Sequence, residues 1–110
     1  MQTAMERSDM KHMVSYTLKP DHVAENERFV EAVFAALREA RPSGPRHATF
    51  RLPDGVSFVH VVSQAEADGS NALTSLPAFK AFAAGVRDRC VAAPVQVELT
   101  EIGSYGVFGD

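Results

Sequence analysis

The stretch that decides the fold is RHATFRLPDGVSFVHVVSQ, residues 46–64, which has the pattern of a β-hairpin. Its first arm alternates between apolar and polar side chains, as strands do. The Pro-Asp-Gly run at residues 53–55 then favours a tight turn, because proline presets φ and glycine accepts positive φ. The second arm is apolar on both faces, with Phe58 on one face and Val59 on the other. We therefore expect a strand that is covered on both sides.

The chain has 110 residues, 45% of them hydrophobic and 23% charged, and this composition suits one globular domain. A net charge of −3 with scattered basic residues argues against nucleic acid as a partner. Cys90 is the single cysteine, which excludes an intrachain disulfide and suits a cytoplasmic protein. No apolar run reaches the ~20 residues that span a bilayer, so we expect no membrane partner. We expect residues 1–9 to be a disordered arm and residues 10–110 to be one domain with a C-terminal tail.

Alternating residues predict a strand before the hairpin and another near the C-terminus. Apolar side chains at three- and four-residue spacing predict a helix after the first strand and another before the last. In chain order, these segments are residues 12–18, 22–41, 77–90 and 95–100. We expect Asp21 to cap the first helix and Ser75 to cap the second.

The resulting order, βαββαβ, predicts an α+β fold of the ferredoxin-like type, with a four-stranded antiparallel sheet and both helices on one face. The first and third strands would be central. No element of the chain then remains to cover the other face, although the hairpin places apolar side chains there. Exposed apolar faces of this kind are typical of interfaces. We therefore expect a homodimer formed through the sheet face, each sheet covering the other.

Several segments resemble the dimeric α+β barrel superfamily, in particular its small antibiotic-biosynthesis-monooxygenase-like (ABM) domains. Beside the element order, the resemblance rests on VSYTLKP (14–20), AENERFVEAV (24–33), DGVSFVHV (54–61) and SLPAFKAF (75–82). It covers residues 11–105 and implies a dimeric α+β barrel. The superfamily includes cofactor-independent oxygenases, haem-degrading enzymes and other small-molecule enzymes, so the fold alone does not assign a reaction.

The absence of tryptophan distinguishes this sequence from two branches of the superfamily. The haem-degrading branch has an Asn-Trp-His constellation, and the quinone-forming oxygenases also use a tryptophan. This sequence contains none. We therefore carry over no catalytic residue from either branch, and haem degradation is not favoured.

His60 is the strongest candidate for catalysis, because it interrupts an apolar central strand and a buried histidine can act as an acid or base near neutral pH. Tyr16, on the other central strand, would donate a hydrogen bond to a bound phenol or enolate oxygen. Both residues also have a structural interpretation. His60 would be a core histidine satisfied by one hydrogen bond, and Tyr16 a packed ring with its hydroxyl at the rim.

Aromatic residues predict an apolar pocket between the helices and the sheet, with plain core packing as the alternative. The residues expected to line it are Phe34, Phe50, Phe58, Phe79 and Phe82. We expect Cys90 to be a small buried hydrophobic residue.

The remaining histidines give weaker signals. His12 and His60 would supply two metal ligands, one fewer than a catalytic site usually needs, so we expect no metal ion and no cofactor. We expect His22 and His47 to be solvated. Single arginines are usually surface charges, although an anionic substrate would need one of them: Arg51, Arg87 or Arg89.

Two functions fit these observations. The first is a cofactor-independent, monooxygenase-like enzyme that acts on a small aromatic or polyketide-like molecule, with His60 as base and Tyr16 as donor. The alternative is a non-catalytic dimer that binds a small apolar ligand or has a structural role. An apolar tail would either latch the dimer or pack on its own subunit. Its residues are Ile102, Tyr105, Val107 and Phe108.

Overall fold

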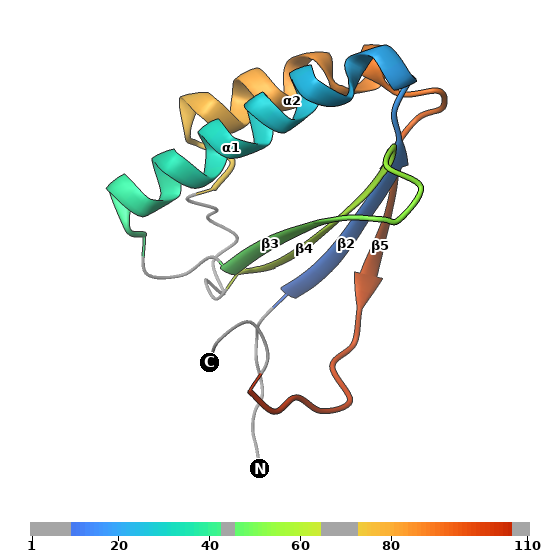
Figure 1. Cartoon of the computed structure of the whole chain (residues 1–110). Helices are drawn as coiled ribbons and strands as arrows, with labels where there is room; N and C mark the ends of the chain where they lie inside the picture. The colour runs from blue at the N-terminus through green and yellow to red at the C-terminus, as the bar shows by residue number, and fades with distance from the viewer. Residues whose placement is uncertain (1–9, 43–45, 65–72, 107–110) are drawn as a thin grey trace.

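A computed structural model of the chain describes residues 10–42, 46–64 and 73–106. A four-stranded antiparallel sheet carries two helices on one face, which confirms the predicted α+β class (Figure 1). The elements are β2 (Met10–Thr17), the 3-10 helix η1 (Pro20–His22), α1 (Val23–Ala40), β3 (Arg46–Arg51), β4 (Ser57–Gln64), α2 (Pro77–Arg89) and β5 (Val95–Leu99). The expected disordered arm, residues 1–9, lies outside the described residues.

The strand order is β3-β4-β2-β5, so the first and third predicted strands are central, as expected. The β3–β4 turn forms as the Pro-Asp-Gly run predicts, with Gly55 at φ 79°. Asp54 Oδ1 accepts hydrogen bonds from the amides of Val56 at 3.0 Å and Ser57 at 2.8 Å. The Leu52 amide donates to the Ser57 carbonyl at 2.8 Å. These bonds fix the hairpin register and therefore which side chains face the helices.

Both helices begin differently from the sequence prediction. Asp21 lies inside η1 and does not cap α1, which begins at Val23 without a side-chain cap. Ser75 does not cap α2 either, because that helix begins at Pro77 with Leu76 in the cap position. A proline in the first turn explains the difference at α2, since its fixed φ starts the helix and it has no amide that needs a cap.

The described core lies at the end of the sheet where β2 meets the C-terminus of α2. Leu18 is 1% exposed and forms an isolated antiparallel bridge with Cys90, which is buried as expected. The Lys19 amide donates to the Arg89 carbonyl at 2.8 Å. This junction therefore fixes the end of α2 against the central strand. The buried cluster consists of Tyr16, Leu18, Phe58 and Cys90.

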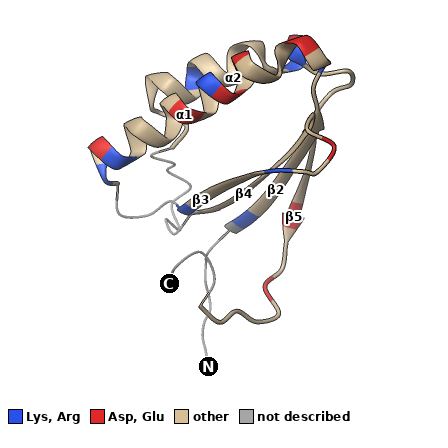
Figure 2. Cartoon of the chain, viewed as in Figure 1, with Lys and Arg blue, Asp and Glu red and all other residues tan. Residues whose placement is uncertain are grey.

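The register assigns a face to every strand residue, because ladder partners lie on the same face. Tyr16 and His60 contact residues of the helices and so define the covered face. The opposite face has apolar side chains on all four strands, with Lys11, Ser15, Arg46 and Ser63 among them, and bears no other element among the described residues. The residues of this bare face include Met13, Ala48, Phe50, Val59, Val61, Val95, Val97 and Leu99. Figure 2 shows most of the charged residues on the helices and few on the sheet.

The C-terminal tail does not pack on its own subunit where it is described, since Ile102 is 95% and Tyr105 is 98% exposed. Val107 and Phe108 lie outside the described residues. No helix in the described part of the chain is long and apolar enough to cross a membrane.

Candidate functional site

A chain of hydrogen-bonded polar side chains crosses the space between the sheet and the helices. Tyr16 Oη lies 2.6 Å from His60 Nε2, so the two central strands are joined through their side chains. From α1, Asn26 Nδ2 donates to Tyr16 Oη at 3.0 Å. From the end of α2, Arg89 Nε donates to Asn26 Oδ1 at 3.0 Å. Asn26 is 0% exposed, His60 5% and Arg89 3%, so these groups depend on one another for hydrogen bonding.

Arg89 is a buried cation among neutral partners. Its Nη2 donates to the Phe82 carbonyl at 3.0 Å, and its guanidinium lies 4.5 Å from the centroid of the Phe29 ring. A carbonyl dipole and an aromatic face both favour a positive charge. A Cβ at Gly85 would lie 3.0 Å from Nη1, so the absence of a side chain there gives the guanidinium its room.

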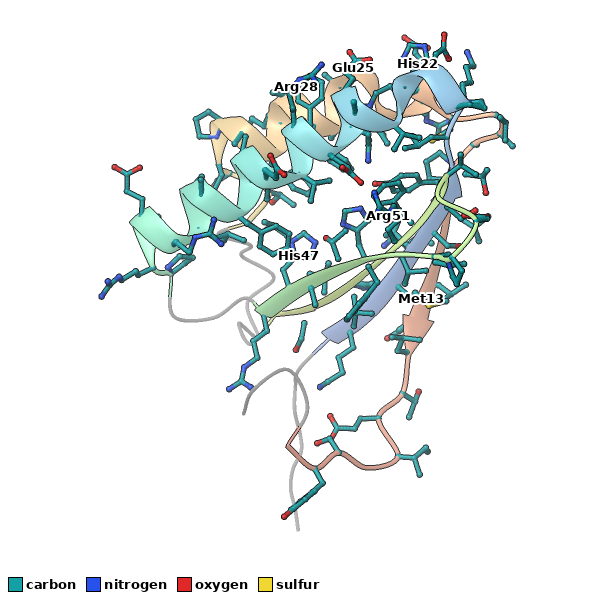
Figure 3. All side chains as sticks on the ribbon, viewed as in Figure 1. Met13, His22, Glu25, Arg28, His47 and Arg51 are labelled. Atoms are coloured by element: carbon teal, nitrogen blue, oxygen red, sulfur yellow. The ribbon has the colours of Figure 1, made fainter. Side chains whose placement is uncertain are left out.

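The other end of this hydrogen-bonded network lies at β3. His60 Nδ1 lies 2.9 Å from Thr49 Oγ1 and 3.1 Å from His47 Nε2. The His47 ring also packs against Phe34, with centroids 4.9 Å apart. Figure 3 shows His47 between β3 and α1, whereas Met13 lies on the side of the sheet away from the helices. The buried chain thus runs from α2 through both central strands to β3.

The hydrogen bonds select one tautomer of His60. Tyr16 Oη already accepts a hydrogen bond from Asn26, and its own hydrogen has His60 Nε2 as the acceptor at 2.6 Å. A buried hydroxyl hydrogen needs an acceptor, so we assign the donor role to Tyr16, which leaves Nε2 unprotonated and places the ring hydrogen on Nδ1. That N–H lies 2.9 Å from Thr49 Oγ1, which can accept it. His60 is therefore held through both of its ring nitrogens.

Burial keeps the two imidazoles and the phenol of this hydrogen-bonded network neutral. It lowers the pKa of His47 to about 4. Burial, followed by the influence of His47, also lowers the pKa of His60 to about 4. Burial raises the pKa of Tyr16 to about 12, although the hydrogen bond from Asn26 acts in the opposite direction. At neutral pH the site therefore contains uncharged imidazoles and an uncharged phenol.

A cavity of about 250 Å³ opens beside His60, between the sheet and α2. His12, His47, His60 and Gln96 contribute the polar groups of its sheet side, and Val14 and Val62 lie between them. The walls toward the helix are mostly apolar and comprise Leu73, Thr74, Phe79 and Phe82. Among the described residues, no three histidine, cysteine or acidic side chains lie close enough together to hold a metal ion.

Four of the five phenylalanines predicted to line one pocket line two separate hollows in the structure. Phe79 and Phe82 line the cavity, and Phe34 and Phe58 line a separate hollow of about 270 Å³ between α1 and the sheet. The prediction for Phe50 is wrong, because the β3 register places it opposite Val59 on the bare face, where it is 47% exposed.

Four residues of the buried hydrogen-bonded network were not predicted from the sequence: Asn26, His47, Thr49 and Arg89. His47 was expected to be solvated because it lies on an outer strand, but here its side of β3 faces the helices. Arg89 was expected at the surface. A sequence signal existed for Asn26 and Arg89, since each falls on the apolar stripe of its helix, in step with Val30 and Val86 respectively.

Comparison with known proteins adds the family context. No protein-family model matches the chain, and neither does any curated protein. Solved structures do match. A Caulobacter crescentus protein, provisionally named an antibiotic biosynthesis monooxygenase, is 19% identical at a TM-score of 0.71, covering 88% of this chain and 92% of its own. An asparagine-to-alanine variant of SnoaB, a cofactor-independent oxygenase from Streptomyces nogalater, is 20% identical at 0.66, covering 89% and 97%. At such identities the likeness establishes the fold, which confirms the α+β architecture that the sequence resemblance implied.

The low pKa values of His47 and His60 predict a loss of stability in mild acid. Because both folded-state pKa values lie below the ordinary 6.5, the unfolded chain binds more protons between pH 6.5 and 4. The free energy of unfolding should therefore decrease as the pH is lowered through this window, by up to about 2 kcal/mol per pH unit for two histidines. Urea titrations between pH 5 and 7 measure this slope. His47→Phe should reduce it by about half, and equal slopes for the native and variant chains would contradict the assignment.

Proposed function

We propose that this chain, which has the fold of the antibiotic-biosynthesis-monooxygenase-like proteins, is a homodimeric, cofactor-independent oxygenase for a small aromatic molecule. The observation that carries the proposal is an apolar cavity with a neutral, hydrogen-bonded imidazole pair, His47 and His60, in its wall. The naming of SnoaB as a cofactor-independent oxygenase supports the reaction class.

The cavity suits a substrate that provides its own electrons. Its volume of about 250 Å³ lies just below the ~300 Å³ at the lower end of ligand pockets, which favours one or two fused rings over a larger polyketide. Aromatic walls exclude water around such a ring, and this protects a reactive anion from side reactions.

The proposed reaction begins when an acidic C–H or O–H group of the substrate gives its proton to His60. The resulting enolate or phenolate then reduces O₂. In the overall change, a ring CH₂ and O₂ yield a ring C=O and H₂O. One oxygen atom enters the product, the other leaves as water, and the substrate supplies all the electrons. A bound anion raises the pKa of nearby imidazoles, so His60 becomes a stronger base when the enolate forms beside it.

Each residue of the buried hydrogen-bonded network has a separate role in this scheme. His60 lines the cavity and accepts the proton at Nε2, its ring nitrogen without a hydrogen, and Tyr16 then changes from hydrogen-bond donor to acceptor. Tyr16 does not line the cavity, and its hydroxyl is engaged with His60, so we assign it a positioning role in place of the direct donor role predicted from sequence. Asn26 and Arg89 hold Tyr16 in turn.

The bare face of the sheet is the proposed dimer interface. Apolar side chains from all four strands lie on it, with Ser15 between Val59 and Val95, and Val95 is 58% and Val97 is 41% exposed. The alternation of β3 supports this assignment, since its apolar residues Ala48 and Phe50 lie on the bare face while His47, Thr49 and Arg51 face the helices. A second copy related by a twofold axis would present the same apolar rows and close both faces at once.

Oxygen uptake with naphthols and catechols, which have one or two rings, tests the proposed reaction. We expect His60→Gln to lower kcat by about 10²-fold, the usual scale for loss of a general base. Tyr16→Phe keeps the ring but loses the hydroxyl that orients His60, and we expect a smaller loss of roughly tenfold in kcat. His22→Gln is the matched control, because His22 pairs with Glu25 outside the cavity and its loss should not change the rate.

Two results would count against the proposal. The first is a native protein that oxidises no member of the panel. The second is a folded His60→Gln variant that turns over at the native rate, which would remove His60 from the mechanism.

Sedimentation equilibrium tests the dimer. The native chain should sediment as a dimer, and Val97→Glu should weaken association by at least about 100-fold, because it buries a carboxylate without a partner. Ala83→Glu adds the same charge on the exposed surface of α2 and should leave the dimer intact. A monomeric native protein, or a Val97→Glu dimer of native strength, would contradict the assignment.

A further inference from the structure

We propose that the cavity selects flat, uncharged ring compounds with oxygen functions at two opposite edges, and that His12 and Gln96 bind the second oxygen. The inference deepens the proposed function and rests on it, since it names the class of molecule that the cavity accepts.

The strand register spaces the polar groups of the cavity in two pairs. His47 and His12 are both ladder partners of Val62, on opposite sides of it. His60 and Gln96 are both partners of Val14, again on opposite sides. Members of a pair therefore lie two strand spacings apart, roughly 9–10 Å between their backbones. The cavity has a polar end at His47 and His60, a valine centre, and a second polar end at His12 and Gln96.

His12 has an unused hydrogen-bonding capacity at this second end. Its Nδ1 is buried and has no hydrogen-bond partner among the described residues. The other ring nitrogen, Nε2, can bind a ligand oxygen as a hydrogen-bond donor when it carries the hydrogen. The amide of Gln96, on the exposed edge strand, can both donate and accept.

The apolar centre of the cavity defines the middle of the ligand. Val14 and Val62 form its floor, and Phe79 and Phe82 lie opposite on α2 with their ring centroids 6.2 Å apart. Branched aliphatic side chains below and aromatic rings above pack well against a flat ring system, whereas a polar group in this position would be desolvated without a partner.

The charge around the cavity limits the ligand to neutral oxygen functions. None of the described residues that line it is a lysine or an arginine. The nearby guanidinium of Arg89 is directed to Asn26 and to the Phe82 carbonyl. A carboxylate or phosphate at either end would thus lose its hydration without gaining a cationic partner. Hydroxyl and carbonyl groups match the donors and acceptors present.

Binding measurements with two naphthalene derivatives test the inference. We expect 1,5-dihydroxynaphthalene, with oxygens on opposite edges, to bind the native protein about fivefold more tightly than 1-naphthol, the gain from one neutral hydrogen bond. His12→Phe and Gln96→Leu should each reduce this preference and leave the affinity for 1-naphthol close to native. Gln96 is exposed, so its replacement keeps the test valid if His12→Phe fails to fold. His22→Gln should keep the full preference.

The outcomes separate this inference from the proposed function. If 1-naphthol binds but the diol has no advantage, or the advantage survives in both variants, the second polar end is wrong and the proposed function stands. If neither compound binds, both are overturned.

Discussion

The hydrogen bond between Tyr16 and His60, 2.6 Å long, is the interaction on which the rest of the site depends. It joins the two central strands inside the covered face, where neither side chain can reach bulk water. Each group therefore needs a further partner, and the partners come from every surrounding element: Asn26 from α1, Arg89 from α2, and Thr49 and His47 from β3. A polar network buried in this way is stabilising only when it is complete, so the helices and the sheet have one favourable arrangement.

The network also explains why the polar side chains of β3 face the helices and its apolar side chains do not. In a sheet with one solvated face, the apolar side of an outer strand normally packs on the helices. Here the polar side, with His47 and Thr49, faces the helices because it completes the network, and Ala48 and Phe50 are left on the bare face. The alternation of β3 thus places the polar residues that build the site on one face and the apolar residues that favour a dimer on the other.

The sequence predicted the element order, the central strands and the candidate pair His60 and Tyr16, because period-two and helical patterns report burial directly. It did not predict Asn26 and Arg89, since polar residues on an apolar stripe are usually treated as interruptions of the stripe. His47 was misjudged for a different reason. Alternation shows that two faces differ in polarity, but only the register shows which face the helices cover. The cavity depends on packing between α2 and the sheet, which no local pattern contains.

The protonation of the His60 ring is the most direct test of this account, and ¹⁵N chemical shifts of the imidazole at pH 7 measure it. The hydrogen bond donated by Tyr16 predicts a neutral ring with its hydrogen on Nδ1 and an unprotonated Nε2. A ring protonated on Nε2, or an imidazolium at this pH, would contradict the account, since Tyr16 would then not be the donor that holds His60 at the cavity.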